Sequence, residues 1–208
     1  MANKLHEGGE TRIVDAFHAV DLGAPFKVVL TDCVTAQFDR NGEMVNYTIP
    51  DFEGLVRSVV MARLAHDRKL NGAELKFLRK AVGVSQADLA RILDFKTEHL
   101  SKVENGHVPL TTMAERWARV FLFEEAAKLH KMEEGELKSK LHDLLRKMFD
   151  GMKPVAAFSP EELEFIFHRE SAALDEAAAA NDDWQEAGSG ISGLGKWSAV
   201  DELEAACG

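Results

Sequence analysis

Polar and charged side chains with the reach to bind another molecule are concentrated in the stretch SQADLARILDFKTEHLSKVENG, residues 85–106. Their spacing between apolar positions is typical of two short helices joined by a tight turn, an arrangement that suits the reading of DNA. Glu98 and Lys102 stand four residues apart and therefore share one helix face. They can each contact DNA, or they can pair with one another at the surface for about 0.2–0.5 kcal/mol.

The net charge of the whole chain argues against DNA as a partner, but the charge is unevenly distributed along the chain. The formal charge is −10. Residues 1–54 hold four Lys/Arg and nine Asp/Glu, residues 55–119 hold twelve and seven, and residues 120–208 hold nine and nineteen. Because salt screens charges beyond roughly 8–10 Å, the local surplus of five positive charges in 55–119 matters more than the total. The acidic flanks are expected to lower non-specific DNA affinity.

The sequence lacks the residue patterns that are typical of membrane proteins, exported proteins, metal-binding proteins and enzymes. No run of about 18 apolar residues exists, so no membrane span is expected, and MANKLHEGGETR lacks the apolar core of a signal peptide, which makes the cytoplasm the expected location. Cys33, Cys207 and the eight histidines show neither a disulfide framework nor zinc-site spacing. No Ser/His/Asp order or activated cysteine is visible, so no enzyme, metal or cofactor is expected. GSGISG (188–193) matches GxGxxG but follows no strand, and a flexible tail is the better interpretation.

Three consecutive helices are expected to position the polar side chains. The first ends at Gly83, the second starts at Ser85 with Asp88 in the Glu/Gln place of a capping box, and the third ends at Asn105-Gly106. The positions expected to face inward are Leu75, Phe77, Leu78, Ala81 and Val82 in the first helix, Leu89, Ala90, Ile92 and Leu93 in the second, and Leu100 and Val103 in the third.

The segment LRKAVGVSQADLARILDFKTEHLSKVENG (78–106) resembles the Cro/C1-type, or Xre-like, helix-turn-helix family of phage repressors and bacterial regulators. The family's leucine-arginine helix end, Ser/Asn-Gln helix start, Leu-Ala pair and terminal Glu-Asn-Gly all occur at matching spacing without a gap. The resemblance implies a five-helix Cro/C1 domain. Together with the C-terminal helices and the small N-terminal β-hairpin that the apolar patterns indicate, the expected fold is mainly α. A three-helix bundle that makes only protein contacts is the alternative; Gln86 and the local positive charge favour DNA.

The resemblance also implies roles by position. Thr97 and Glu98 begin the recognition helix and Lys102 follows one turn later, which makes them the candidates for base contacts in the major groove. Lysine there donates to guanine O6/N7 or to phosphate, and glutamate accepts from cytosine N4. The candidates for phosphate contacts are Gln86, Lys96, Asn105, His107 and Arg91, and a base edge is the alternative contact for Gln86. Other basic residues expected to contribute to phosphate binding are Arg57, Arg63, Arg68 and Lys69. Arg79 and Glu104 correspond to a structural ion pair that ties the first helix to the third.

Two positions depart from the family pattern. The tight turn usually holds Gly and here has Asp94, which tolerates the left-handed conformation at some cost. The recognition helix usually starts with a Ser or Thr cap, and here Lys96 occupies that place with Thr97 next. Either the helix starts one residue late or its cap is lost at roughly 1 kcal/mol.

The rest of the chain divides by composition. Residues 1–24 are expected to form a weakly ordered arm, and 25–69 a hairpin around Asn41-Gly42 followed by an amphipathic helix over 52–66. The DNA-binding domain spans 70–121. Residues 122–180 are expected to be helical and to serve dimerisation, with one long helix over 122–149 and another from Ser159 that includes Leu163, Ile166, Phe167 and Leu174. The Gly-, Ser- and acid-rich residues 181–208 are expected to form a flexible tail.

A second resemblance concerns residues 49–80 together with the hairpin before them. A run in antitoxin-like regulators, which carry a β-rich, often zinc-binding N-terminal segment, is similar to Leu70, Gly72, Glu74, Leu78, Arg79 and Lys80; the zinc ligands do not occur here.

The expected function is that of a sequence-specific transcriptional regulator that binds double-stranded DNA as a homodimer, on a near-palindromic operator with half-sites roughly 34 Å apart. The alternatives are an antitoxin that masks a toxin and autoregulates its operon, and a protein-interaction module without DNA binding.

Overall fold

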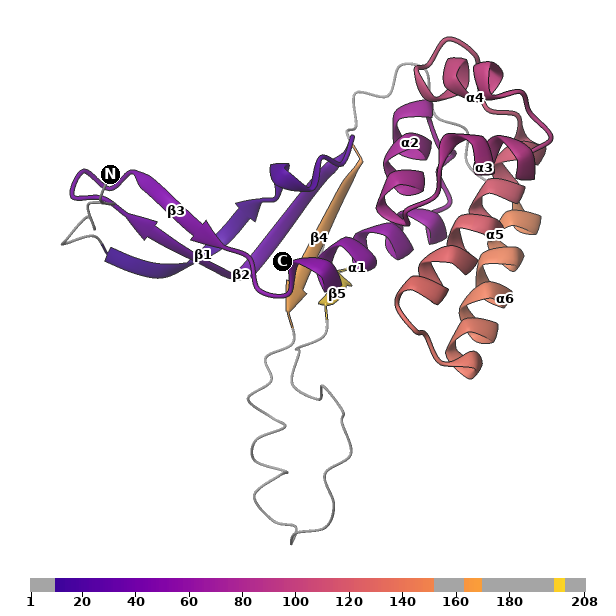
Figure 1. The fold of residues 1–208 in the computed structure, drawn as a ribbon. Helices are drawn as coiled ribbons and strands as arrows, with labels where there is room; N and C mark the ends of the chain where they lie inside the picture. Colours follow the sequence, from indigo (N-terminus) through magenta and orange to yellow (C-terminus); the bar gives the residue numbers. More distant parts are fainter. Residues whose placement is uncertain (1–9, 152–162, 170–196, 201–208) are drawn as a thin grey trace, which may run out of the picture. The chain divides into compact units, whose positions relative to one another are not determined.

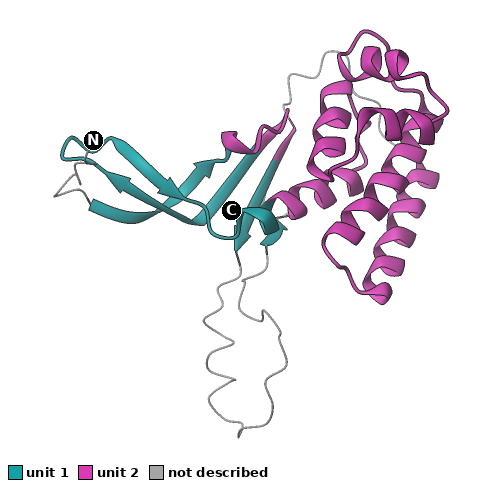
Figure 2. Ribbon diagram, viewed as in Figure 1, with its two compact units in different colours: residues 1–19, 28–55, 165–208 teal, residues 20–27, 56–164 magenta. Residues whose placement is uncertain are grey.

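A computed structural model describes residues 10–151, 163–169 and 197–200 of the 208-residue chain. The chain divides into two compact units (Figure 2): residues 1–19, 28–55 and 165–208 form a sheet unit, and residues 20–27 and 56–164 form a helical unit. In chain order the larger part of the helical unit, residues 56–164, is therefore inserted into the sheet unit. None of the helices in the described residues is long and apolar enough to cross a lipid bilayer.

The sheet unit is built around one long strand. β2 (Lys27–Phe38) pairs antiparallel with β1 (Glu10–His18) and with β3 (Met44–Thr48). Two short strands from the other end of the chain, β4 (Glu164–Arg169) and β5 (Trp197–Val200), complete the sheet in the order β1-β2-β4-β5, and β3 pairs beside β2 (Figure 1). A short 3-10 turn, η1 (Val20–Leu22), follows β1.

The predicted hairpin is confirmed, and its turn has a local cause. The Asp39 carboxylate accepts hydrogen bonds from the backbone amides of Asn41 and Glu43, each at 2.9 Å, and Gly42 adopts φ +80°. Glycine takes that left-handed conformation without steric cost. Beyond the hairpin, the indole Nε1 of buried Trp197 donates to the Asp51 carbonyl at 3.2 Å, which ties β5 to the residue before the first helix.

Three predictions about the chain ends were wrong within the described residues. Residues 10–18, predicted as part of an arm, form β1 because β2 supplies a paired edge along its whole length. Residues 164–169, predicted as helix, form β4, and residues 197–200, predicted as tail, form β5. The remainder of both predicted segments lies outside the described residues. The described residues thus form six helices and a five-stranded sheet, so the predicted mainly α fold with a hairpin is confirmed only in part.

The helices are α1 (Phe52–Ala65), α2 (Gly72–Ala81), α3 (Gln86–Ile92), α4 (Thr97–Glu104), α5 (Thr112–Leu129) and α6 (Glu134–Asp150). The predicted helix over 52–66 is confirmed by α1. The single long helix predicted over 122–149 is wrong, because α5 ends at Leu129 and the backbone reverses at Lys131, which adopts φ +50°. Leu144 and Met148 of α6 are buried in the core of the helical unit, so the apolar stripe of this helix packs internally.

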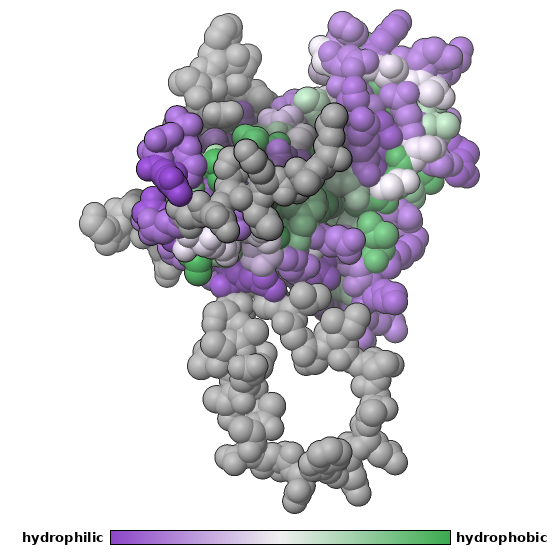
Figure 3. All heavy atoms as spheres, turned by 60° about the vertical axis from the view of Figure 1, so that its left-hand side comes forward, coloured by the Kyte–Doolittle hydropathy of each residue, from purple (hydrophilic) through white to green (hydrophobic). Residues whose placement is uncertain are grey.

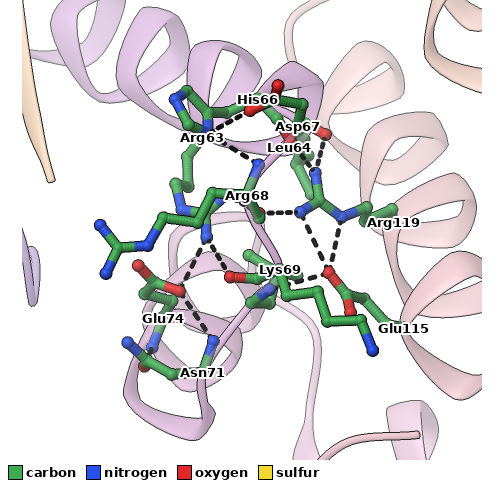
Figure 4. Close-up of polar contacts among 11 residues, drawn as sticks. Arg63, Leu64, His66, Asp67, Arg68, Lys69, Asn71, Glu74, Glu115 and Arg119 are labelled. Atoms are coloured by element: carbon green, nitrogen blue, oxygen red, sulfur yellow. Dashed lines mark hydrogen bonds and ion pairs between the residues drawn. The ribbon is translucent and has the colours of Figure 1, made fainter. Parts of the chain in front are cut away.

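A buried network of four charged side chains holds the loop between α1 and α2 (Figure 4). Arg63 donates to the carbonyls of Arg68 and Lys69 and to Glu74, at 2.8–3.0 Å. Arg119 donates to the carbonyls of Leu64, His66 and Arg68, the last of which it shares with Arg63. It also donates to Glu115, whose carboxylate accepts from the Leu70 amide at 2.8 Å. Burial, followed by the charge of Arg63, lowers the pKa of Arg119, and Glu115 opposes this shift. The network gives the buried polar backbone of this loop partners that water would otherwise supply.

α2 starts with a full capping box and lies very close to α4. The Asn71 side chain accepts from the Glu74 amide, and the Glu74 carboxylate accepts from the Asn71 amide. A Cβ placed on Gly72 would lie 2.0 Å from the carbonyl oxygen of Val103. Only glycine fits at this crossing, which fixes the distance between the first and third helices of the motif.

Candidate nucleic-acid interface

The start of α3 is fixed by Ser85. Its hydroxyl accepts from the Asp88 amide at 3.1 Å and donates to the Asp88 carboxylate at 2.6 Å. This hydrogen bond, and then the one from Arg91, lowers the pKa of Asp88. Leu89, Ala90 and Leu93 are buried as predicted, whereas Ile92 is 43% exposed and does not face inward.

The turn into α4 shows at which residue the recognition helix begins. Asp94 adopts φ +54°, so the left-handed position of the turn is filled by a residue that tolerates it. Lys96 is the N-cap residue and its side chain makes no capping hydrogen bond, so α4 begins at Thr97. The cap is therefore lost, at about 1 kcal/mol, and the helix does not start late.

The two faces of α4 are clearly separated. Leu100 and Val103 are buried in the core. Thr97, Glu98 and Lys102 are exposed, as is Lys96 before them. No ion pair joins Glu98 to Lys102 in the part of the chain that the structure describes, which leaves both side chains available to a ligand.

Glu104, at the end of α4, holds two residues from the other helices of the motif. Arg79 of α2 donates to it through Nε at 2.6 Å and Nη2 at 3.0 Å, so the ion pair implied by the resemblance is present. Gln86 of α3 donates to Glu104 through Nε2 at 2.8 Å. Arg79 also donates to the Val84 carbonyl at 2.9 Å. The carboxylate of Glu104 thus connects all three helices.

The other candidate side chains lie around α4 and differ in exposure and in their hydrogen-bond partners. Asn105 caps α4, with Nδ2 donating to the Ser101 carbonyl at 2.9 Å, while Lys76 donates to its Oδ1 at 3.4 Å. His107 is exposed. Arg91 is exposed and pairs with Asp88 at 3.0 Å. Sequence reasoning missed Lys76 because the cation reaches Asn105 from α2, and the spacing within α2 gives no sign of this.

The burial of three ion pairs shows which residues carry the positive charge of segment 55–119. Three arginines of residues 55–119 are buried with three glutamates, in the pairs Arg63–Glu74, Arg79–Glu104 and Arg119–Glu115. The surplus of five positive charges then rests on nine Lys/Arg and four Asp/Glu outside these pairs. The prediction that Arg63 contributes a phosphate contact was wrong, because this side chain is fully buried. Figure 3 shows a surface that is mainly hydrophilic on one face, with apolar side chains exposed in places.

The run Leu70-x-Gly72-x-Glu74 that resembles antitoxin-like regulators has a structural explanation. The Leu70 amide is bound by Glu115, Gly72 permits the close crossing with α4, and Glu74 caps α2 while pairing with Arg63. The signals for this network are present in the sequence: Asn71 and Glu74 have capping-box spacing, and Glu115 and Arg119 stand four residues apart. No group of His, Cys, Asp or Glu within the described ranges is placed to hold a metal ion.

A family model described as helix-turn-helix matches residues 75–122. These residues hold most of α2, all of α3 and α4, and most of α5, and the match supports the resemblance to Cro/C1-type (Xre-like) helix-turn-helix regulators. No curated protein and no solved structure is significantly similar to the chain.

Proposed function

We propose that this protein is a cytoplasmic transcriptional regulator that binds a specific DNA site through α4 and acts as a homodimer. The observation that carries the proposal is the exposed face of α4. Thr97, Glu98 and Lys102 project from a helix whose opposite face is buried, and nothing in the described residues occupies them. Side chains that are backed by a rigid core keep one geometry, and this is what base recognition needs.

In this proposal the two groups of candidate residues have different tasks. Lys102 donates to guanine or to a phosphate, Glu98 accepts from cytosine, and Thr97 contacts either base class. Gln86, Lys96, Arg91, Asn105 and His107 lie around the recognition helix and contact the phosphate backbone. Phosphate contacts set affinity and orientation, whereas base contacts set the sequence.

A cluster of exposed apolar side chains supports a dimer. Met113 and Trp117 lie one turn apart on α5 and Phe149 lies near the end of α6, and all three are more than half exposed. Arg116 donates to the Met148 carbonyl at 2.9 Å, which brings the end of α6 beside the start of α5. Each large aromatic side chain buries about 150–250 Å² when covered, so the cluster can form the centre of a two-fold interface.

The proposal is tested by DNA binding to the region upstream of the protein's own gene, measured by fluorescence anisotropy over a series of salt concentrations. A specific regulator should bind one site about 10³-fold or more tighter than random DNA. Its affinity should fall steeply as salt rises, because bound phosphates release counterions. Sedimentation of the wild type and of Trp117→Lys tests the dimer. Equal affinity for specific and random DNA at low salt would refute sequence-specific regulation.

The separate sheet unit supports a second candidate function, that of an antitoxin. Ile13 of β1 and Met44 and Val45 of β3 are exposed, although they lie on strands of a formed sheet. Exposed apolar positions on a sheet offer a surface to a protein partner. Co-expression with the product of an adjacent gene tests this function: a stable complex that Ile13→Asp weakens supports it, and free separation of the two proteins refutes it.

A further inference from the structure

The contact between Glu104 and Gln86 has a consequence for DNA binding. Glu104 is almost fully buried, and its Oε2 accepts from Gln86 Nε2 at 2.8 Å and from Arg79 Nη2 at 3.0 Å. Its Oε1 accepts from Arg79 Nε at 2.6 Å. An ionised carboxylate accepts hydrogen bonds and cannot donate one. The Gln86 amide must therefore turn its nitrogen toward Glu104, which fixes the orientation of a side chain that is only partly buried.

We propose that Glu104 is a positioning residue, which holds the Gln86 amide so that its second N–H group donates to a DNA phosphate. The inference rests on the proposed function, because it concerns how the same motif binds DNA. Arg79 acts one step further back, since its two bonds fix the Glu104 carboxylate in place. Each of the three helices contributes one member: Arg79 from α2, Gln86 from α3 and Glu104 from α4.

The placement of Gln86 favours a phosphate as its ligand. Gln86 is the first residue of α3, directly after the cap Ser85. In this motif the helix that precedes the recognition helix crosses the DNA backbone, so its N-terminus faces phosphates. A phosphate oxygen only accepts, and Gln86 retains one free amide hydrogen after binding Glu104. Pre-orientation of that donor removes the loss of rotamer freedom that a mobile glutamine suffers on binding.

The first test needs no substitution. Relaxation of the side-chain ¹⁵NH₂ groups in the DNA-free protein reports how rigid each glutamine amide is. Gln86 should have an order parameter near about 0.85, as rigid backbone has. The exposed Gln37 on β2 accepts one long hydrogen bond, from Asn46 at 3.5 Å, and its order parameter should fall below about 0.6. An amide of Gln86 as mobile as that of Gln37 overturns the proposal, whether or not any variant folds.

The second test is a double-mutant cycle on affinity for the specific DNA site, with Gln86→Met, Glu104→Gln and the double variant. Gln86→Met should weaken binding about three- to tenfold, equally for specific and random DNA, and should leave the salt dependence unchanged because the lost group is neutral. Glu104→Gln should weaken binding in the wild-type background and have much less effect when Gln86 is already Met. Circular dichroism of each variant verifies that it is folded.

The outcomes separate this proposal from the one on which it rests. Losses that simply multiply show that Glu104 does not act through Gln86, and overturn the positioning role. A loss in Gln86→Met that depends on the DNA sequence assigns Gln86 to a base and overturns the phosphate contact. Failure of the unmodified protein to bind DNA overturns the proposed function itself, and the positioning role with it.

Discussion

Replacement of Arg119 by methionine should be among the most destabilising single changes in the helical unit. Arg119 is 1% exposed, and its guanidinium donates to the carbonyls of Leu64 and His66 at 2.6–2.7 Å and to Glu115 at 3.1–3.2 Å. In Arg119→Met the fully buried Glu115 carboxylate retains only the Leu70 amide as a hydrogen-bond donor. A buried charge without its partner is costly because water cannot reach it.

The magnitude follows from what is lost. Breaking one side of a buried ion pair costs about 3–5 kcal/mol. The Arg68 carbonyl is not orphaned, since Arg63 also donates to it at 3.0 Å, so only the Leu64 and His66 carbonyls lose their guanidinium donor. A loss of about 3–5 kcal/mol is a large share of the 5–15 kcal/mol typical of a folded protein.

Urea unfolding, followed by the helical circular dichroism signal, measures the change. The matched control is Arg91→Met, which removes an ion pair whose arginine side chain is 75% exposed and should cost less than about 1 kcal/mol. The double variant Glu115→Met/Arg119→Met should recover part of the loss, because no buried charge remains. It should stay less stable than wild type, because the Leu64 and His66 carbonyls still lack donors. An Arg119→Met variant as stable as Arg91→Met would refute the reasoning.

Three further changes test separate features of the helical unit. Gly72→Ala should destabilise the protein by about 1–3 kcal/mol and weaken DNA binding, because the new Cβ meets the Val103 carbonyl oxygen. The control Gly135→Ala in α6 has open space around the new Cβ and should stabilise the protein by about 0.5–1 kcal/mol. Thermal unfolding that shows equal stability for the two variants would contradict this. Lys102→Ala should lower the slope of log affinity against log salt by about 0.9 if the lysine binds a phosphate, or reduce discrimination by about 1–3 kcal/mol if it binds a base, while Lys138→Ala on α6 should change neither. The Ser85 hydroxyl and then Arg91 lower the pKa of Asp88 below its ordinary value of 3.8, so this carboxylate stabilises the folded state above that pH and the stabilisation is lost as pH falls through the lowered pKa. Asp88→Asn should therefore lose less stability than wild type in thermal unfolding between pH 5 and pH 2, and equal losses would argue against this role.

The helix-turn-helix could be predicted from the sequence because its signals are local. Gly83, Ser85 and Asn105 mark helix ends, and apolar residues at helical spacing mark the buried faces, all within about 30 residues. The ion pair of Arg79 and Glu104 came from the family resemblance. The bond from Gln86 to the same carboxylate did not, because it depends on how α3 lies against α4. Ile92 was misassigned for a related reason: it has the right spacing, but α3 ends there and its side chain turns to solvent.

The sheet could not be predicted in full because its pairing is long-range. Leu163, Ile166 and Phe167 have spacings of three and one, which fit a helix as well as a strand of six residues, and Ser159-Pro160 before them is a typical helix start. What decides between the two is the edge of β2, which lies far away in sequence. The Thr31 hydroxyl of β2 donates to the Phe167 carbonyl of β4 across 136 residues. No pattern within residues 163–169 carries that information.

The long separation of β2 and β4 in the chain bears on how the stability of the sheet depends on the helical unit. β2 precedes α1 in the chain and β4 follows α6, so the pairing of β2 with β4 closes a loop that contains all six helices of the described residues. The entropy cost of closing a loop rises with its length, and a helical unit that has already folded shortens the flexible part of the connection. The helical unit depends on contacts among its own helices and on its own buried ion pairs, which lie between residues of α1 to α5. We therefore expect loss of the helical residues to destabilise the sheet more than loss of the sheet strands destabilises the helical unit.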